Sequence, residues 1–571
     1  MGVKNRIVFT TSCIEVQCER NDTETQTKLA EFYPIHSNRI RTLHKMSKHN
    51  APEVLKALRG IDASNIDTAP SAIQNYFYNE MRLRENTSDL LKNGPRESCI
   101  VSERLTLKPH QQLGRELARY QDRFAFFYDT RTGKTPLSLA IINDDVIANP
   151  THKWLVVCPL ILIYNAWLDD APKFFPDLKV VNCHAATPAR RQKAIGTPAN
   201  VYLTNTESFV SYRKYFYEMK FQGAFVDESS DLKSPKSKVS QEMVDFAQTV
   251  QRFYLLSGTP APNGEWEYYM QMRAIDYYGW HSSYAQFKEH YFINLSYEPQ
   301  YEKLALRPDR KDELYDRLKT YSLFIDKEDV LDTPGRTFHE VEYNMPDELM
   351  KHYRKMKNEL YVEFGENMRI TAPSAAATLN KLNQVSSGFI LDTQARKENK
   401  FYGTDEKEWY LLDDWRFKAL QQLLDKEGIR GEQVLIWANY RREFELIKGM
   451  LGDQCVLVYG GVNIEAKNNA LRAFKEGHIR YLVANPASAD KGLTLTNCHI
   501  AIYFSLNWSY ELFKQSYDRI YADKAIQPNH CDYYIMIAKH TIDGVLYRDV
   551  LQGKQVNSYA VLNHLKPEVL T

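Results

Sequence analysis

An apolar run stops at a polar turn in Phe124-Ala-Phe-Phe-Tyr-Asp-Thr-Arg-Thr-Gly-Lys-Thr135, and a helical pattern follows. A buried strand would deliver such a turn to the edge of a sheet, where the N–H groups of the helix attract an anion. Lys134 would then reach the β and γ phosphates of a nucleotide, the Thr135 hydroxyl would bind Mg²⁺, and Gly133 would allow close backbone approach. Tyr128 replaces the first glycine of the usual phosphate-loop pattern, so an ordinary turn stays open as an alternative.

Composition narrows the class of protein but not its activity. The chain has 571 residues, which predicts about three or four domains. With 73 basic and 72 acidic residues the net charge is +1, so binding to a polyanion would need a local basic groove. The eight cysteines form no Cys-x-x-Cys pair, which argues against a zinc ribbon and a disulfide framework and fits a reducing cytoplasm. The most apolar segment, Trp154 to Leu168, is too short to span a bilayer, so we expect no membrane partner.

Polar residues follow apolar segments that predict further parallel strands of an α/β sheet. One strand ends in the acidic pair, Asp227 and Glu228. A carboxylate at a strand end can hold Mg²⁺ and its neighbour can polarise an attacking water, although an isolated Asp-Glu pair is usually exposed charge. Before the turn, Gln111 carries an amide that could read the edge of adenine. The predicted strands and their polar ends cover residues 154–159, 201–205, 223–226 and 253–256.

A second α/β unit is predicted to begin near Trp415. Its strands would be residues 433–438, 456–459, 479–484 and 500–504, interleaved with helical patterns. A last helix is expected over residues 508–524. On it, spacings of three and four residues place four side chains on one face, namely Gln515, Asp518, Arg519 and Ala522.

The first hundred residues carry no catalytic signature. Residues 6–17 have the pattern of a strand, and residues 38–49 have a helical pattern rich in Lys, Arg and His. The basic segment is either a solvated helix face or a surface that contacts a phosphate backbone.

Several short motifs, taken in order, resemble those of superfamily 2 helicases. The matching stretches are Lys108-Pro-His-Gln111, Thr132-Gly-Lys-Thr135, Val157-Cys-Pro-Leu160, Asp227-Glu-Ser-Ser230, Ser257-Gly-Thr-Pro260 and Gln515-Ser-Tyr-Asp-Arg519. Three further details resemble the Snf2-like double-stranded DNA translocases. They are Ser257-Gly-Thr-Pro-Ala-Pro-Asn263 followed by Trp266, Lys327-Glu-Asp-Val-Leu-Asp-Thr-Pro334, and Thr541-Ile-Asp-Gly544. The compact inserts resemble the small phage and bacterial members, including phage branch-migration helicases.

This resemblance, which covers roughly residues 105–555, implies two RecA-like lobes, parallel sheets flanked by helices, with helical inserts. The residues before it are expected to form an additional N-terminal α+β domain. It also implies that ATP binds with Mg²⁺ and that DNA runs across both lobes. The implied catalytic residues are Lys134, Asp227, Glu228, Gln515 and Arg519. The implied nucleotide contacts are Gln111, Thr130, Arg131, Thr132, Gly133, Lys134, Thr135 and Gly492, with Thr135 and Asp227 on the metal.

The sequence departs from the family pattern at three positions. Arg131 replaces a glycine of the phosphate loop, and Ser230 replaces the usual His after the acidic pair. Ala522 stands where the family has a second arginine, which puts hydrolysis in doubt because an arginine finger contributes on the order of 10³ to 10⁵ in rate.

The domain organisation that we expect follows the motifs. An accessory domain that recognises DNA structure comes first, then the first lobe, a helical insert, a helical connecting region, the second lobe and a tail. Their respective ranges are residues 1–100, 101–263, 264–332, 333–411, 412–555 and 556–571.

The expected activity is that of a DNA-dependent ATPase that remodels duplex, forked or four-way DNA in recombination or repair, as a monomer in a bacterial or phage-infected cytoplasm. Two alternatives are an RNA-directed helicase of the same superfamily and a nucleic-acid-binding module that has lost hydrolysis.

Overall fold

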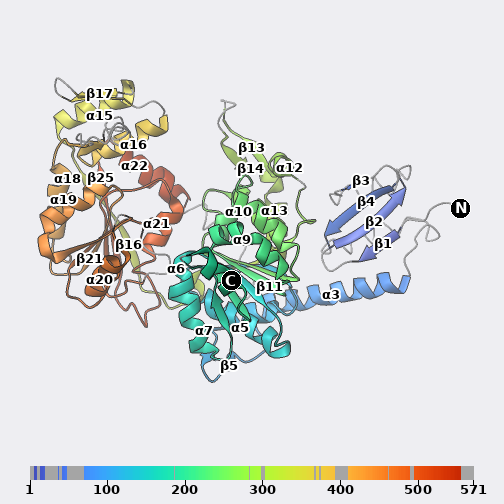
Figure 1. Cartoon of the computed structure of the whole chain (residues 1–571). Helices are drawn as coiled ribbons and strands as arrows, with labels where there is room; N and C mark the ends of the chain where they lie inside the picture. The colour runs from blue at the N-terminus through green and yellow to red at the C-terminus, as the bar shows by residue number, and fades with distance from the viewer. Residues whose placement is uncertain are drawn as a thin grey trace. The chain divides into compact units, whose positions relative to one another are not determined.

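The computed structural model describes most of the chain. The described residues are 6–9, 13–19, 36–37, 41–47, 70–185, 187–281, 283–296, 302–359, 361–364, 368–371, 375–391, 409–460, 462–488 and 494–554. The chain divides after Val330 into two compact units, each with its own sheet (Figure 1). Within the first unit, a smaller antiparallel sheet of four strands precedes the large sheet in the sequence.

The small N-terminal sheet corrects one sequence-based prediction. Strand β4 (Arg41–Ser47) lies in the basic segment that was predicted to be helical, and it pairs with β2 (Cys13–Glu19). Opposite residues Ile14 and Met46 are both fully buried. Pairing between strands therefore overrides the local helical pattern, because it buries a common face. The remaining strands are β1 (Arg6–Phe9) and β3 (His36–Ser37), in the order β1-β2-β4-β3, and helix α3 (Pro70–Asn93) follows.

The first unit is built on a parallel sheet of seven strands in the order β15-β7-β12-β11-β8-β10-β9. All the strands predicted for this part are present. Two more were missed because β9 has only three residues and β15 ends a stretch with a helical pattern. The strands are β7 (Arg123–Tyr128), β8 (Trp154–Val157), β9 (Val180–Asn182), β10 (Val201–Thr204), β11 (Gly223–Asp227), β12 (Arg252–Leu256) and β15 (Ser322–Ile325).

Helices cover both faces of this sheet (Figure 1). Alternate residues of β7 point to opposite faces, so Phe126 packs in one hydrophobic core and Phe127 in the other. Strands buried on both faces are continuous apolar runs, which is why they could be read from the sequence. One core includes α4 (Pro109–Leu117) and α5 (Lys134–Ala148), and the other includes α9 (Thr206–Glu218), α10 (Lys238–Ala247), α11 (Tyr268–Ile275) and α13 (Lys311–Tyr321).

The second unit is built on a parallel sheet of six strands in the order β16-β25-β24-β21-β23-β22. Its edge strand β16 lies inside the region that was predicted to be a helical connection. The helical prediction was wrong there because β16 is held by eight paired positions along β25, about 190 residues later. The strands are β16 (Arg336–Tyr343), β21 (Val434–Trp437), β22 (Cys455–Val458), β23 (Tyr481–Ala484), β24 (Ile500–Tyr503) and β25 (Cys531–Ala538).

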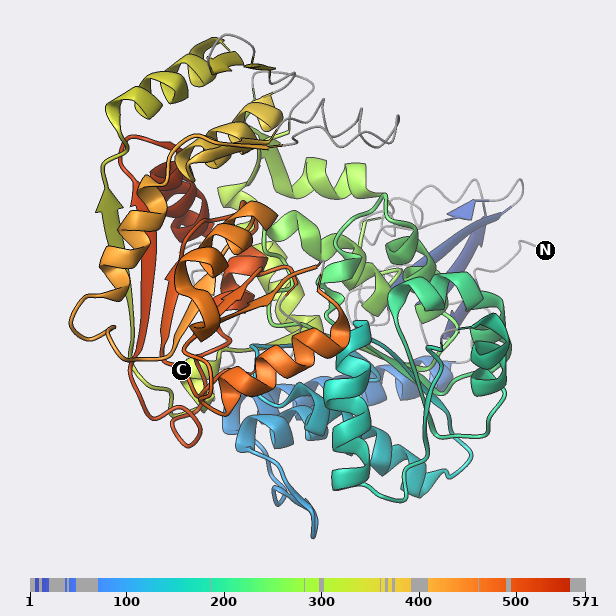
Figure 2. The ribbon, with the colours of Figure 1, turned by 60° about the vertical axis from the view of Figure 1, so that its left-hand side comes forward.

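Helices also lie on both faces of the second sheet (Figure 2). One hydrophobic core contains Ile436 and the other contains the neighbouring Trp437 of β21. The first core includes α18 (Trp415–Leu424) and α19 (Arg441–Leu451), and the second includes α20 (Ile464–Lys475), α21 (Tyr510–Tyr517) and η8 (Val545–Gln552).

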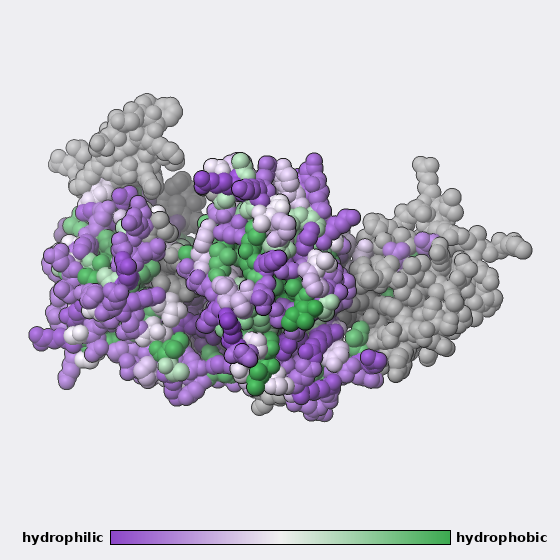
Figure 3. Space-filling model, turned by 60° about the horizontal axis from the view of Figure 1, so that its bottom comes forward, coloured by the Kyte–Doolittle hydropathy of each residue, from purple (hydrophilic) through white to green (hydrophobic). Residues whose placement is uncertain are grey.

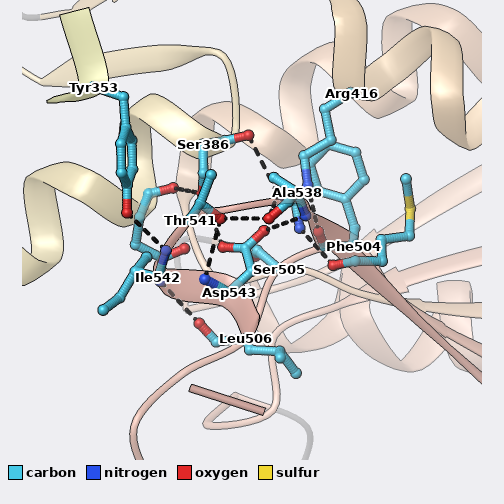
Figure 4. A network of polar contacts seen from close by, with 12 residues as sticks. Tyr353, Ser386, Arg416, Phe504, Ser505, Leu506, Ala538, Thr541, Ile542 and Asp543 are labelled. Atoms are coloured by element: carbon cyan, nitrogen blue, oxygen red, sulfur yellow. Dashed lines mark hydrogen bonds and ion pairs between the residues drawn. The ribbon is translucent and has the colours of Figure 1, made fainter. Parts of the chain in front are cut away.

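A buried ion pair fixes the motif Thr541-Ile-Asp-Gly544 within this unit (Figure 4). Arg416 at the start of α18 contacts Asp543 at 2.6 Å, and both side chains are at most 4% exposed. The guanidinium also donates to the carbonyl oxygens of Phe504, Ser386 and Met536. Arg416 thus connects the motif and α18 to the residue after β24, to β25 and to the end of α16 (Ala375–Ser386).

Hydrophilic residues cover most of the molecular face drawn in Figure 3, and hydrophobic residues form separate groups on it. Among the described helices, none is both long and apolar enough to cross a membrane.

Candidate active site

Three neighbouring strands of the first sheet end in the polar turns that the sequence singled out. β12 lies between β7 and β11, and all three are parallel, so their carboxyl ends share one edge of the sheet. The edge therefore combines the phosphate loop (residues 129–133), the acidic pair and the hydroxyl turn (residues 257–260). Ligands bind at this edge in open α/β sheets.

The phosphate loop leads directly into α5, as the sequence predicted. Gly133 caps this helix with a positive φ of 84°, and a Cβ there would lie 1.8 Å from the Gln111 amide nitrogen. Lys134 is the first helical residue, and its ammonium donates to the carbonyl oxygens of Tyr128 at 3.0 Å and Asp129 at 3.3 Å. Thr135 follows on the same turn and is half-buried. The lysine is thus held over the loop at the positive end of the helix.

Arg131 explains what the family glycine does at this position. Its φ of 65° lies in the left-handed region, where a residue with a side chain costs about 1–2 kcal/mol. Within the same loop, the Thr132 hydroxyl donates to the Asp129 carbonyl at 2.7 Å. Thr130 N–H bonds to the Asp129 carboxylate at 2.7 Å. The loop keeps its shape without the glycine because these bonds hold the turn.

Gln111 lies against the phosphate loop. Its Nε2 donates to the carbonyls of Thr132 at 2.8 Å and Gly133 at 3.4 Å, and its Oε1 accepts from Lys108 N–H at 2.8 Å. Neighbouring His110 bonds to the same Thr132 carbonyl, and burial lowers its pKa to about 4. The amide supports the loop in this arrangement, and its contact with adenine stays a prediction.

The acidic pair is buried and not merely exposed charge. Asp227 is 5% exposed and Glu228 is 9% exposed, with a positive φ of 57° at Glu228. Burial, and then the charge of Glu228, raise the pKa of Asp227 to about 6, while Lys134 opposes this shift. Trp167 donates its indole N–H to the Asp227 carboxylate at 3.2 Å. The structure therefore brings Lys134 close enough to influence Asp227, and it adds Trp167, which no sequence motif had indicated.

The raised pKa of Asp227 predicts that this site weakens the fold. Because the folded pKa of about 6 exceeds the ordinary aspartate value of 3.8, the stability present at low pH is lost as pH rises between these values. Asp227→Asn should therefore raise the free energy of unfolding by about 1–3 kcal/mol at pH 8, and by much less at pH 4. Chemical denaturation at both pH values, with a chelator and no nucleotide, measures this. A gain of equal size at both pH values would contradict the charge as its cause.

The hydroxyl turn packs on the phosphate loop. A Cβ on Gly258 would lie 3.2 Å from Thr130 N, so the close approach of the two turns favours glycine there. Ser257 is fully buried and accepts a bond from Thr259 N–H at 3.1 Å.

A buried glutamine on α11 links the hydroxyl turn to the acidic pair. Gln271 donates to the Pro260 carbonyl at 2.7 Å and accepts from the Ser229 hydroxyl at 2.8 Å. Sequence reasoning missed Gln271 because a lone glutamine in a helical pattern carries no signal. Gln271 therefore bridges the hydroxyl turn and Ser229, the residue that follows the acidic pair.

Lys327 was noted only as part of a family-like stretch, yet it reaches the phosphate loop. It begins α14 (Lys327–Val330), is 1% exposed, and donates to the Thr130 hydroxyl at 2.9 Å. Its ammonium lies 4.0 Å from the Asp129 carboxylate. A second buried cation therefore supports the loop.

The residues predicted in the second unit lie around the end of α21. Gln515 is in the helix, but the helix ends at Tyr517, so Arg519 and Ala522 lie beyond it. The prediction of one helical face for all four side chains was wrong. Ala522 is fully buried, and Gly492 lies outside the described residues.

Tertiary hydrogen bonds explain why this helix stops early. The carbonyl of Tyr517 accepts from the Tyr533 hydroxyl, and that of Arg519 accepts from Leu495 N–H. The carbonyl of Ile520 accepts from Gln527. With these partners, the carbonyls do not continue the helical ladder.

The residues at the edge of the first sheet fit a nucleoside triphosphate and a hard divalent cation. Backbone N–H groups at the start of α5 and the Lys134 ammonium suit phosphate oxygens. A buried carboxylate, Asp227, and the Thr135 hydroxyl are oxygen donors of the kind that Mg²⁺ prefers. A bound cation would supply charge neutralisation at the phosphates, and the role of Glu228 toward the attacking water stays a prediction.

Comparisons with known proteins agree with this arrangement. A family model described as the SNF2-related domain matches residues 33–396, and one described as the helicase conserved C-terminal domain matches residues 415–522. Protein p41 of the Acyrthosiphon pisum secondary endosymbiont phage 1 is 27% identical over 435 residues, which is 72% of this chain and 89% of that protein.

Longer relatives share only part of their length with this chain. The mouse DNA annealing helicase and endonuclease ZRANB3 is 21% identical over 504 residues, which is 83% of this chain and 44% of that protein.

A solved structure, the Sulfolobus solfataricus SWI2/SNF2 ATPase core in complex with dsDNA, aligns with a TM-score of 0.35 and 18% identity, covering 80% of this chain and 94% of that one.

The SNF2-related match covers more than half of the chain, and the helicase C-terminal match covers most of the second sheet. Both sheets are parallel and flanked by helices, and the first presents a phosphate loop beside a buried acidic pair. This chain therefore belongs to the SNF2-related family and is an ATP-dependent helicase-type enzyme with two RecA-like lobes.

Proposed function

We propose that this enzyme uses ATP and Mg²⁺ to move along duplex DNA and to remodel forked or four-way DNA in recombination or repair. The observation that carries the proposal is the set of buried groups around the phosphate loop. Lys134, Asp227 and Glu228 together provide phosphate contact, metal ligation and a proton acceptor. Gln515 and Arg519 are proposed to act on the same nucleotide from the second lobe.

The names of relatives support DNA as the partner. ZRANB3 is named as a DNA annealing helicase, and the relative p41 belongs to a phage. The phage relative is consistent with a bacterial or phage-infected cytoplasm, which we propose as the location of the enzyme. We also propose that the enzyme works as a monomer. Phosphate contacts should dominate its affinity, because a motor must accept any sequence, so binding should weaken steeply with salt.

The test is ATP hydrolysis measured with matched linear duplex, single-stranded, forked and four-way DNA, and with RNA. We expect the highest stimulation with branched duplex DNA. Stimulation by RNA alone would favour the RNA-directed alternative. Nucleic-acid binding without hydrolysis would favour a binding module, for which Ala522 is the supporting observation.

The N-terminal sheet is proposed to recognise the branched structure. A chain that starts near Val101 should keep DNA-stimulated hydrolysis and lose its preference for four-way over linear duplex DNA. An unchanged preference in a well-folded truncation would refute this role.

Lys327 should matter for turnover although it is not part of the phosphate loop. Lys327→Met keeps the length of the side chain but removes the ammonium that binds Thr130 and faces Asp129. We expect kcat to fall by at least about tenfold, because the loop loses a buried support near the reacting phosphates. Steady-state ATPase kinetics with saturating DNA measure this, with Lys319→Met on α13 as a control. Equal rates in the two variants would show that Lys327 only fills space.

A further inference from the structure

The part of the first unit between the hydroxyl turn and β15 forms a cavity of about 460 Å³ that is open to solvent and shares no lining residue with the nucleotide site. Helix α12 (Tyr284–Tyr291) supplies one side. The end of β14 (Leu304–Leu306) and the short helix η6 (Pro308–Arg310) supply another. The lining residues are His281, Gln286, Glu289, His290, Arg307 and Arg310.

One of the two arginines is already matched by a carboxylate. Arg310 contacts Glu313 at 2.9 Å. Glu313 also accepts from Tyr291 at 3.0 Å and lies 2.9 Å from His290 Nε2. These contacts hold the pKa of Glu313 below its usual range despite burial. The Glu313 carboxylate is therefore paired with groups in the wall of the cavity, so it adds little negative charge to the cavity itself.

Arg307 is held at one end only. Its Nε donates to the Phe292 carbonyl at 3.3 Å, which fixes the plane of the guanidinium. Within the described ranges of the chain, Arg307 forms no ion pair. A positioned guanidinium that lines a cavity and is not paired with a carboxylate of the described residues is suited to a phosphate group, whose oxygens it can bind in pairs.

The other lining groups are compatible with an anion. His281 is 3% exposed, and burial, followed by the charges of Arg317 and His290, lowers its pKa to about 4. Its ring is therefore neutral at pH 7, and it lies 4.9 Å from the His290 ring between centroids. Glu289 is the acidic member of the lining, but it is an exposed residue of α12 whose charge solvent screens.

We propose that this cavity binds a phosphate group, with Arg307 as its principal ligand and Arg310 and the two histidines around it. Given the proposed function, on which this choice of source rests, the phosphate belongs to a DNA backbone. The hairpin that precedes Arg307, β13 (Phe292–Asn294) with β14, exposes Ile293 by 40% and Leu295 by 50%. Aliphatic side chains next to a phosphate ligand suit the sugars and bases of nucleic acid better than a free ion.

The test compares Arg307→Ala and Arg307→Glu with the same changes at Lys303, an exposed residue of the same hairpin that does not line the cavity. Dissociation constants for linear duplex and four-way DNA are measured over a range of salt concentrations. We expect Arg307→Ala to weaken DNA binding by about fivefold or more and to lower the salt slope by about 0.9, and Arg307→Glu to weaken it further. The Lys303 variants should show smaller changes.

Two additions separate the sources of phosphate and guard against misfolding. Calorimetry with inorganic phosphate counts sites, of which the phosphate loop supplies one; loss of one site in Arg307→Ala with unchanged DNA affinity would identify a free phosphate as the ligand. Arg307→Gln keeps a donor for the Phe292 carbonyl and should behave like Arg307→Ala. DNA affinity, salt slope and phosphate stoichiometry all equal to those of the Lys303 controls would overturn the proposal. Absence of DNA-stimulated hydrolysis in the unsubstituted protein would instead refute the proposed function.

Discussion

Lys134→Ala is expected to lower the kcat for ATP hydrolysis by at least about 100-fold, because the lysine stabilises charge on the transferring phosphate. The structure places its ammonium at the start of α5, where two loop carbonyls hold it and where its charge acts on Asp227. Preorganised charge of this kind has its largest effect in the transition state, so kcat should fall more than DNA affinity.

The matched control for this change is Lys238→Ala. Lys238 is also the first residue of a helix on the first sheet, α10, but it is exposed and distant in sequence from the site. Steady-state kinetics with saturating DNA, together with a DNA-binding curve for each variant, make the comparison. Turnover in Lys134→Ala equal to that of Lys238→Ala would remove the basis for assigning the phosphate loop.

Most of the nucleotide site in the first lobe could be predicted because its signals are local. β7, the turn and α5 follow one another within 26 residues, and an apolar run followed by Gly-Lys-Thr indicates a strand, a turn and a helix. Asp227 and Glu228 likewise follow directly on a buried strand. The shared edge of the sheet then brings these separate local signals together.

The errors come from contacts between distant parts of the chain. β4 and β16 are strands because of partners elsewhere, and α21 ends early because tertiary donors take its last carbonyls. Gln271, and the contact of Lys327 with the phosphate loop, were missed for the same reason. Each becomes visible only when a turn more than forty residues away is placed beside it.

The second large effect is expected in the stability of the second lobe. Replacement of Arg416 by leucine would leave the Asp543 carboxylate buried, with the Ser386 hydroxyl and Ala538 N–H as its remaining donors within the described part of the chain. Breaking a buried ion pair on one side typically costs about 3–5 kcal/mol, because the desolvated partner keeps its charge. Asp543→Asn should cost a similar amount, moderated by the three carbonyls that still bind the guanidinium.

The matched control is Lys418→Leu, on the same helix. Lys418 also contacts an aspartate, Asp414, but that pair is exposed to solvent, so its loss should leave the unfolding midpoint nearly unchanged. Chemical denaturation gives the midpoints, and hydrogen exchange assigns any loss of protection to the second lobe. If Arg416→Leu unfolds no earlier than Lys418→Leu, the buried pair does not stabilise this lobe.

The double variant Arg416→Leu/Asp543→Asn distinguishes the charge from the packing. If the penalty of each single variant comes mainly from an uncompensated buried charge, the double variant has no such charge and should be destabilised by less than the sum of the two single changes. The carbonyls of Phe504 and Met536 lose their donor in both variants that lack Arg416, so recovery should be partial. A strictly additive result would mean that the guanidinium and the carboxylate act through their separate contacts. The motif Thr541-Ile-Asp-Gly544 would then be held in place by its hydrogen bonds to Ala538 at the end of β25 and to Ser386, and not by the ion pair.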